Sequence, residues 1–392
     1  MNWIVPLTDV TVGEEELQAV AEVLRSGWLT QGPRVEAFER AFAGALGVAH
    51  AVAVANGTAA LHLAYAAVGL GAEDEFIIPA VTFVATMNAG IYLGAKPVLA
   101  DCVSADDLTV SPGDVARKIT PRTRLIVTMP YGGFSPDMTA LVNLAREHGI
   151  PLVEDAAHAP LATFKGRALG TFGAAGAFSF FGNKNLTTGE GGMVVSGDDT
   201  LAARIRRMRS HGMTTLTWDR HQGHAADYDV MEPGYNYRMD EVRAALGIEQ
   251  LKKLPEANRK RAENARLLRQ AIESLEIPGL TVPFSSPRGT PAHHLFVLLL
   301  PEGTDRAAFR KRMSQAGIQT SVHYPLLSSF SVWRNYFGSG KSPGLPVALS
   351  VADRLVTLPM GPHLNARSIE MIAQALKKCL NVEETNLKQD EL

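Results

Sequence analysis

A single lysine, Lys184, stands in a setting that a solvent-exposed lysine does not need. It lies in "FSFFGNKNLTTGEGG", residues 178–192, between an apolar run and a group of glycines. The apolar run predicts a buried strand, and Gly189, Gly191 and Gly192 predict a tight return into another strand. Burial lowers the pKa of a lysine, and a neutral amine can attack a carbonyl carbon to form an imine. The alternative is a loop lysine whose ammonium group reaches solvent.

A carboxylate is predicted at the same edge of the sheet. Asp155 ends the β-like run in "IPLVEDAAHA", 29 residues before Lys184. This separation fits one strand–helix–strand excursion, so the two side chains are expected to meet where parallel strands end. A buried carboxylate needs a partner, and the protonated nitrogen of a pyridine ring would serve. The alternative is that Glu154 and Asp155 cap a following helix.

Two further segments supply groups that a cofactor would need. In "VANGTAALHL" a strand leads into a helix at Gly57 and Thr58, where backbone N–H groups can bind a phosphate; the alternative is a plain helix cap at Thr58. Phe83 follows a β-run and could stack on a flat ring, although most phenylalanines belong to the core. An imine-forming amine, a carboxylate, a phosphate cradle and a stacking face together match pyridoxal 5′-phosphate (PLP).

The elements that must position these groups alternate between β-like runs and helical patterns over the first two thirds of the chain. "AVAVAN", "EFIIPA" and "RLIVTMPYGG" each precede a helical segment, which predicts a mostly parallel sheet with helices on both faces. A charged helix follows, expected to bend or restart at Pro255, and then a smaller α/β unit. We therefore predict an α/β fold with a large domain over 1–250, a small C-terminal domain over 251–384 and a frayed tail over 385–392.

Composition excludes several classes of function. The 392 residues carry a formal net charge of −2 and no basic run with interleaved aromatic residues, so a nucleic-acid partner is not expected. No apolar run is long enough to span a bilayer, and the first residues do not form a secretory signal. The two cysteines, Cys102 and Cys379, suggest no disulfide framework, so we expect a cytoplasmic protein.

Metal binding is not expected. Two pairs of residues have a spacing that could hold a metal on a helix: Glu154 with His158, and His221 with His224. Neither pair is accompanied by third and fourth ligands of suitable type.

Taken together, these segments resemble the DegT-type (DnrJ/StrS-like) family of sugar aminotransferases, which are PLP enzymes of the aspartate-aminotransferase fold. The resemblance covers nearly the whole chain, from "SGWLTQGPRVEAFE" through "VANGTAALHLA", "VEDAAHA", "FSFFGNKNLTTGEGG" and "GYNYRMDE" to "SVHYP" and "LPMGPHL". It implies that Lys184 holds PLP as an imine and that Asp155 pairs with the pyridinium nitrogen. It also implies a set of further cofactor contacts: Gly57, Thr58, Phe83, His158 and Ser179.

The resemblance extends to the quaternary structure and the substrate. Asn236 and Arg238 match residues that reach the cofactor from a neighbouring subunit, which implies a homodimer with shared active sites. His323 and Tyr324 match positions near the sugar. For the anionic nucleotide we consider Arg34, Arg238 and the loop 211–224.

The local sequence around Lys184 looks most like aminotransferases of nucleotide-linked 4-keto-6-deoxy sugars, GDP-perosamine synthase among them. This similarity predicts amino transfer from glutamate to such a sugar, in the synthesis of a surface polysaccharide or natural product. The alternatives on the same scaffold are a 3-keto-sugar or inosose aminotransferase and a sugar dehydratase. A PLP-binding regulator without catalysis is an alternative of another class.

Overall fold

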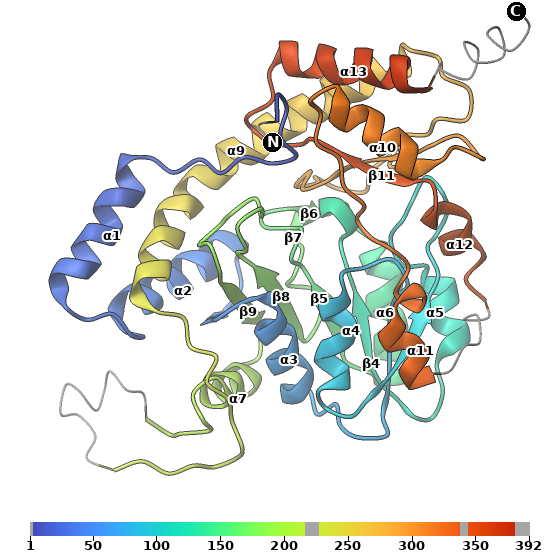
Figure 1. The fold of residues 1–392 in the computed structure, drawn as a ribbon. Coiled ribbons are helices and arrows are strands. Elements are labelled where there is room, and N and C mark those ends of the chain that lie inside the picture. Colours follow the sequence, from blue (N-terminus) through green and yellow to red (C-terminus); the bar gives the residue numbers. More distant parts are fainter. Residues whose placement is uncertain (1–2, 216–226, 338–343, 381–392) are drawn as a thin grey trace, which may run out of the picture.

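The computed structural model of the chain describes residues 3–215, 227–337 and 344–380. The expectations for His221, His224 and the tail 385–392 therefore fall outside the described residues. Figure 1 shows a central sheet flanked by helices, a long helix α9 crossing from this sheet region, and a second group of helices and strands around its far end.

The central sheet has seven strands and is mostly parallel, as predicted. Its order is β1-β9-β8-β5-β4-β2-β3, and only β9 runs antiparallel to its neighbours, β1 and β8. The strands are β1 (His50–Val54), β2 (Glu75–Pro79), β3 (Lys96–Ala100), β4 (Thr123–Thr128), β5 (Leu152–Asp155), β8 (Ala175–Ser179) and β9 (Gly192–Ser196). Because β5 and β8 are parallel neighbours, their carboxyl ends lie side by side at one edge.

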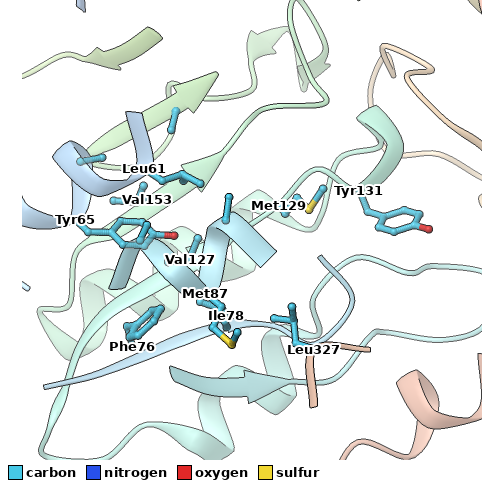
Figure 2. Close-up of a cluster of buried hydrophobic side chains, with 14 of the residues drawn as sticks. Leu61, Tyr65, Phe76, Ile78, Met87, Val127, Met129, Tyr131, Val153 and Leu327 are labelled. Atoms are coloured by element: carbon cyan, nitrogen blue, oxygen red, sulfur yellow. The ribbon is translucent and has the colours of Figure 1, made fainter. Parts of the chain in front are cut away.

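Helices cover both faces of this sheet because successive strand residues point to opposite sides. On one face, Val127 and the other strand residues that point to the same side pack against α3 (Gly57–Ala67) and α4 (Val84–Ile91), as Figure 2 shows. On the other face, Ile126 and the strand residues that point to the same side pack against other helices. These are α2 (Pro33–Leu46), α5 (Pro112–Lys118) and α6 (Met138–His148). The burial of both faces explains why most residues inside these strands are apolar.

Shorter elements complete the large sheet region. Helix α1 (Glu14–Ser26) packs along α9, and α7 (Asp199–Met208) contributes to the core on the α3 face. Two further pieces are the hairpin of β6 (Thr163–Phe164) with β7 (Arg167–Ala168) and the short 3-10 helix η1 (Tyr131–Gly133).

The C-terminal region forms a smaller α/β unit around its own hydrophobic core. The antiparallel pair β10 (Phe296–Leu299) and β11 (Leu355–Leu358) packs there with α10 (Arg306–Gln315) and α13 (Ala366–Leu380). Three elements connect this unit back to the large sheet region: η2 (Leu327–Ser329), α11 (Ser331–Phe337) and α12 (Pro346–Ala352).

Of the bend or restart expected at Pro255, the restart was wrong. Helix α9 (Glu241–Glu273) runs through this proline, and the position 250 at which we placed the domain boundary lies inside it. Pro255 removes one backbone donor, but it lies on the exposed side of the helix. Leu254 is buried in the core of the large sheet region, and Leu268 is buried in the core of the C-terminal unit. Packing on both sides of the proline therefore stabilises one continuous helix.

The helix expected after "VEDAAHA" is also absent, so the helix-cap alternative for Glu154 and Asp155 was wrong. Glu154 is fully buried in β5, and residues 156–162 form turns. The Glu154 carboxylate accepts three backbone N–H bonds, from Gly170 at 2.6 Å, Phe172 at 2.6 Å and Gly173 at 3.0 Å. Glu154 therefore fastens the loop before β8, and its spacing to His158 is not that of two ligands on one helix.

We expect Glu154→Ala to destabilise the fold by about 2–4 kcal/mol, because three backbone donors lose their acceptor in a largely buried place. Urea denaturation followed by circular dichroism would measure the free energy of unfolding. Glu147→Ala, at an exposed position of α6, is the matched control and should stay within about 0.5 kcal/mol of the parent. An equal loss in both variants would contradict this role of Glu154.

The described residues also bear on two other classes of site. In ranges 3–215, 227–337 and 344–380, no helix combines the length and apolar character required to cross a membrane. The same ranges contain no group of three or more histidine, cysteine or acidic side chains arranged to hold a metal ion.

Candidate active site

A cavity of about 580 Å³ opens where β5 and β8 end, and most of the predicted site residues line it. Its volume lies within the usual range for small-molecule sites, roughly 300–1,000 Å³. The predicted residues that line it are Gly57, Thr58, Phe83, Asp155, His158, Ser179, Lys184, His323 and Tyr324. The fold thus brings together segments that are more than 260 residues apart in the chain.

Lys184 lies in the loop that joins β8 to β9. The loop turns directly after the strand, and the Lys184 N–H donates to the carbonyl oxygen of Phe181 at 2.9 Å. Burial lowers the pKa of the Lys184 amine to about 8, although the charge of Asp155 acts in the opposite direction. At pH 7 about one tenth of such an amine is neutral and nucleophilic, far more than for an exposed lysine.

Asp155 ends β5 and is almost completely buried. Its Oδ2 accepts a hydrogen bond from the Thr86 hydroxyl at 2.6 Å, and its Oδ1 accepts the Ala157 N–H at 3.4 Å. Burial raises the pKa of this carboxyl group, while the Thr86 bond and the charge of Lys184 pull it down. The charge of Lys184 acts on Asp155 through the site, but among the residues that the structure describes no salt bridge within 4 Å joins Asp155 to a cation. The carboxylate thus lacks the close positive partner that a buried charge requires.

The amino end of α3 forms another wall of the cavity. Its cap is Asn56, whose side chain accepts the Ala59 N–H at 2.8 Å, so the alternative that Thr58 is the cap was wrong. The capping bond leaves the N–H groups of Gly57 and Thr58, in the first turn, next to the cavity. A Cβ atom at Gly57 would lie 2.8 Å from the Cβ of Ser179, so only glycine lets this helix end approach β8 so closely.

Aromatic and imidazole rings form the opposite wall. His158 is buried, and its Nε2 lies 2.8 Å from the Tyr324 hydroxyl. The Phe83 ring is 51% exposed and lies 5.7 Å from the Tyr324 ring, centroid to centroid. His323 Nδ1 lies 2.9 Å from the Thr357 hydroxyl oxygen, and burial lowers the pKa of His323 to about 4. This wall is uncharged at neutral pH and can receive a flat ring.

Three residues predicted for the site do not line this cavity. Asn236 is exposed, and Arg238 donates to the Ser210 hydroxyl at 3.0 Å. Arg34 pairs with Glu22 at 3.0 Å. The prediction that Asn236 and Arg238 act in a neighbouring subunit concerns a second copy of the chain and stays a prediction.

Several polar groups of the site were not predicted from the sequence. His294 Nε2 lies 3.4 Å from Lys184 Nζ, and Thr86 holds Asp155. His62 Nε2 and Asn183 Oδ1 are buried atoms that find no hydrogen-bond partner among the described residues, and both residues line the cavity. Thr86 was within reach of sequence reasoning, since it follows Phe83 on the first turn of α4. His294 lies 110 residues from Lys184, and no local pattern connects the two.

The donor set fits PLP. An amine with a lowered pKa, a buried carboxylate without a close cation, and free N–H groups beside Ser179 are complementary to an aldehyde, a pyridinium nitrogen and a phosphate. Each of these three features follows from the fold described above.

Comparison with known proteins agrees with this chemistry. The DegT/DnrJ/EryC1/StrS aminotransferase family matches residues 10–377. The spore coat polysaccharide biosynthesis protein SpsC of Bacillus subtilis is 39% identical over 381 residues, 96% of this chain and 97% of SpsC.

Solved structures show the same fold. The aminotransferase TlmJ from Streptoalloteichus hindustanus is 34% identical with a TM-score of 0.89, over 97% of this chain and all of TlmJ. A Streptococcus pneumoniae protein solved in its PLP form is 25% identical with a TM-score of 0.87, over 97% of this chain and 98% of its own. These likenesses confirm the predicted α/β fold, and the family match spans nearly the whole chain. The protein belongs to the DegT/DnrJ/EryC1/StrS family and is an aminotransferase.

Proposed function

We propose that this aminotransferase moves an amino group from glutamate to a nucleotide-linked keto sugar, a 4-keto-6-deoxyhexose, with PLP bound at Lys184. The observation that supports this most directly is one cavity that holds both Lys184, with its pKa of about 8, and Asp155, which forms no salt bridge among the described residues. Two relatives fit a sugar substrate: SpsC is named for polysaccharide biosynthesis, and PseC of Helicobacter pylori is an aminotransferase of pseudoaminic acid biosynthesis.

The residues would divide the work by position. PLP, when bound, supplies an aldehyde that exchanges amino groups and a ring that takes up the electrons released at the reacting carbon. Lys184 Nζ would take the proton from the α-carbon of the amino donor. Asp155 would keep the proton on the ring nitrogen, and the N–H groups of Gly57 and Thr58 with the Ser179 hydroxyl would hold the phosphate.

The outer part of the site would face the sugar. Phe83 and His158 would enclose the flat ring, and His323 and Tyr324 would contact the sugar. The exposed Phe83 indicates that this wall is open in a single chain. In our proposal a second copy completes it, with Asn236 and Arg238 of the partner subunit, in a cytoplasmic homodimer.

The experiment that tests this function uses the PLP-loaded chain, ¹⁵N-glutamate and a panel of nucleotide-linked 4-keto and 3-keto sugars, read by mass spectrometry. We expect 2-oxoglutarate and a 4-amino sugar that contains one ¹⁵N atom. Labelling of a 3-keto sugar alone would move the proposal to that class. Loss of water from a sugar without ¹⁵N would indicate a dehydratase, and no response to any amino donor would indicate a regulator.

A further inference from the structure

We propose that His294 is a positioning residue for Lys184: its ring is held in one tautomer, so that Nε2 accepts a hydrogen bond from the Lys184 amine. This inference deepens the proposed function and rests on the role given there to Lys184. It depends on a chain of hydrogen bonds that joins α9 to the lysine through Asn258, Asn185 and His294.

The first links fix the orientation of two amide groups. Asn258, on α9, donates from Nδ2 to the carbonyl oxygen of Pro160 at 2.9 Å, so its Oδ1 is left as an acceptor. Asn185 donates from Nδ2 to that Oδ1 at 3.0 Å and to the carbonyl oxygen of Ala292 at 2.8 Å. Both amide hydrogens of Asn185 are then in use, and its Oδ1 must face His294.

The orientation of Asn185 decides the tautomer of His294. An amide oxygen can only accept, and Asn185 Oδ1 lies 3.1 Å from His294 Nδ1, so Nδ1 carries the hydrogen. His294 is buried, and burial lowers its pKa well below the ordinary value, so the ring is neutral. A neutral ring with hydrogen on Nδ1 has its lone pair on Nε2. That lone pair lies 3.4 Å from Lys184 Nζ, which donates in both its charged and neutral forms.

The neighbouring His158 has the opposite tautomer, for an equally local reason. Its Nδ1 accepts the Gly132 N–H at 3.2 Å, so its hydrogen is on Nε2 and is donated to the Tyr324 hydroxyl at 2.8 Å. The rings of His158 and His294 lie only 4.3 Å apart. The two histidines thus have distinct duties: His158 donates towards Tyr324, and His294 accepts from Lys184.

An acceptor beside Lys184 has a definite use in proton transfer. A long flexible amine that must reach one carbon gains from a contact that limits its rotamers. The other titratable groups that face the amine are Asp155, His158 and His323. Of the three histidines near the amine in the described structure, His158, His294 and His323, only His294 makes a hydrogen bond with Nζ.

The tautomer can be measured directly on the full-length chain without cofactor. Histidine ¹⁵N chemical shifts distinguish a protonated from an unprotonated ring nitrogen, and the spectrum of His294→Phe identifies the His294 signals. We expect hydrogen on Nδ1 of His294 and on Nε2 of His158. In Asn185→Leu we expect the His294 hydrogen to move to Nε2, with His158 unchanged. Hydrogen on His294 Nε2 in the parent protein would overturn the proposal.

A second readout reports on the lysine itself. The rate at which Lys184 is modified by an amine reagent, followed by peptide mapping against pH, should have its midpoint near pH 8. Loss of the Nε2 acceptor should destabilise the charged amine about tenfold relative to the neutral amine. Asn185→Leu and His294→Phe should therefore lower the midpoint by about one pH unit. His294→Gln, which places an amide oxygen near the Nε2 position, should restore it.

The controls separate a hydrogen-bonding role from a packing role. Asn143→Leu, on α6, should change neither readout. If His294→Gln and His294→Phe shift the midpoint equally, the ring only fills space and the proposal fails. Both readouts are made without PLP, so they stand apart from the test of the function: Lys184 without an imine to PLP would refute the proposed function even with the tautomers as expected.

Discussion

Lys184→Ala is expected to lower the rate of amino transfer to below about 1% of the parent rate. The substitution removes the only residue that we assign to covalent binding of PLP and to proton transfer at the α-carbon. Loss of one well-placed acid–base group alone costs 10²–10⁴-fold. The measurement is the formation of 2-oxoglutarate from glutamate, with an active keto sugar as acceptor.

A second measurement locates the covalent bond. Borohydride reduction of the PLP-loaded parent, followed by peptide mapping, should place the label on residue 184, and the Lys184→Ala chain should bind PLP without becoming labelled. The matched control is Lys165→Ala: this lysine is also in a loop, but it is exposed and donates to the Thr139 hydroxyl at 3.1 Å. Full activity of the Lys184 variant, or a label elsewhere, would refute the assignment.

The position of Lys184 relative to Asp155 could be predicted because it depends on strand ends. An apolar run that stops at a polar residue marks the end of a buried strand, and parallel strands place their carboxyl ends at one edge. Asp155 and Lys184 then meet if the strands that precede them, β5 and β8, are neighbours in the sheet. The structure shows that these strands are neighbours. Gly57 and Thr58 followed from the same rule, applied where β1 leads into α3.

The position of His294 could not be predicted in this way. It lies before β10, in the segment that leads into the small C-terminal unit, and its backbone N–H donates to the carbonyl oxygen of Gly132 at 2.8 Å. Such a contact depends on how two units pack, which leaves no period or spacing in the sequence. Thr86 and Glu154 are intermediate cases. Each lies near a predicted site residue in the sequence. Its hydrogen-bond partner becomes known only from the fold: Asp155 for Thr86, and the loop before β8 for Glu154.

The failed expectation of a helix restart at Pro255 has a similar origin. Proline lacks the backbone donor that a helix needs, so a local rule favours a break. In the structure, buried side chains before and after Pro255 belong to two different cores, and one continuous helix satisfies both. Tertiary packing therefore outweighs the local cost, and a prediction from the sequence cannot weigh the two.

Asp155→Asn is expected to have opposite effects on activity and on the stability of the cofactor-free chain. With PLP bound, removal of the carboxylate would break a buried ion pair with the ring nitrogen, which costs about 3–5 kcal/mol. If this energy is lost from the transition state, the reaction rate falls roughly 10²–10⁴-fold. Asparagine can still accept the Thr86 hydroxyl, so the fold around α4 should be kept. Activity at or below about 1% of the parent is the expected result.

Without cofactor, the same substitution should stabilise the chain at neutral pH. Burial raises the pKa of Asp155 in the folded protein. The folded state then holds its proton to higher pH than the unfolded state, whose aspartate has a pKa near 3.9. The free energy of unfolding of the parent should therefore fall as the pH rises from about 4 through the raised pKa, and the variant should lack this part of the fall.

Urea denaturation of both cofactor-free proteins between pH 4 and pH 8 tests this sign. The gain of Asp155→Asn over the parent should be absent near pH 4 and present at pH 7. Asp353→Asn, at a fully exposed side chain, is the control and should show no pH-dependent gain of this kind. A variant that is less stable than the parent at pH 7 would mean that Asp155 already has a sufficient partner within the chain. In that case the charge of Asp155 would not require a pyridinium nitrogen as its partner, even if activity were lost.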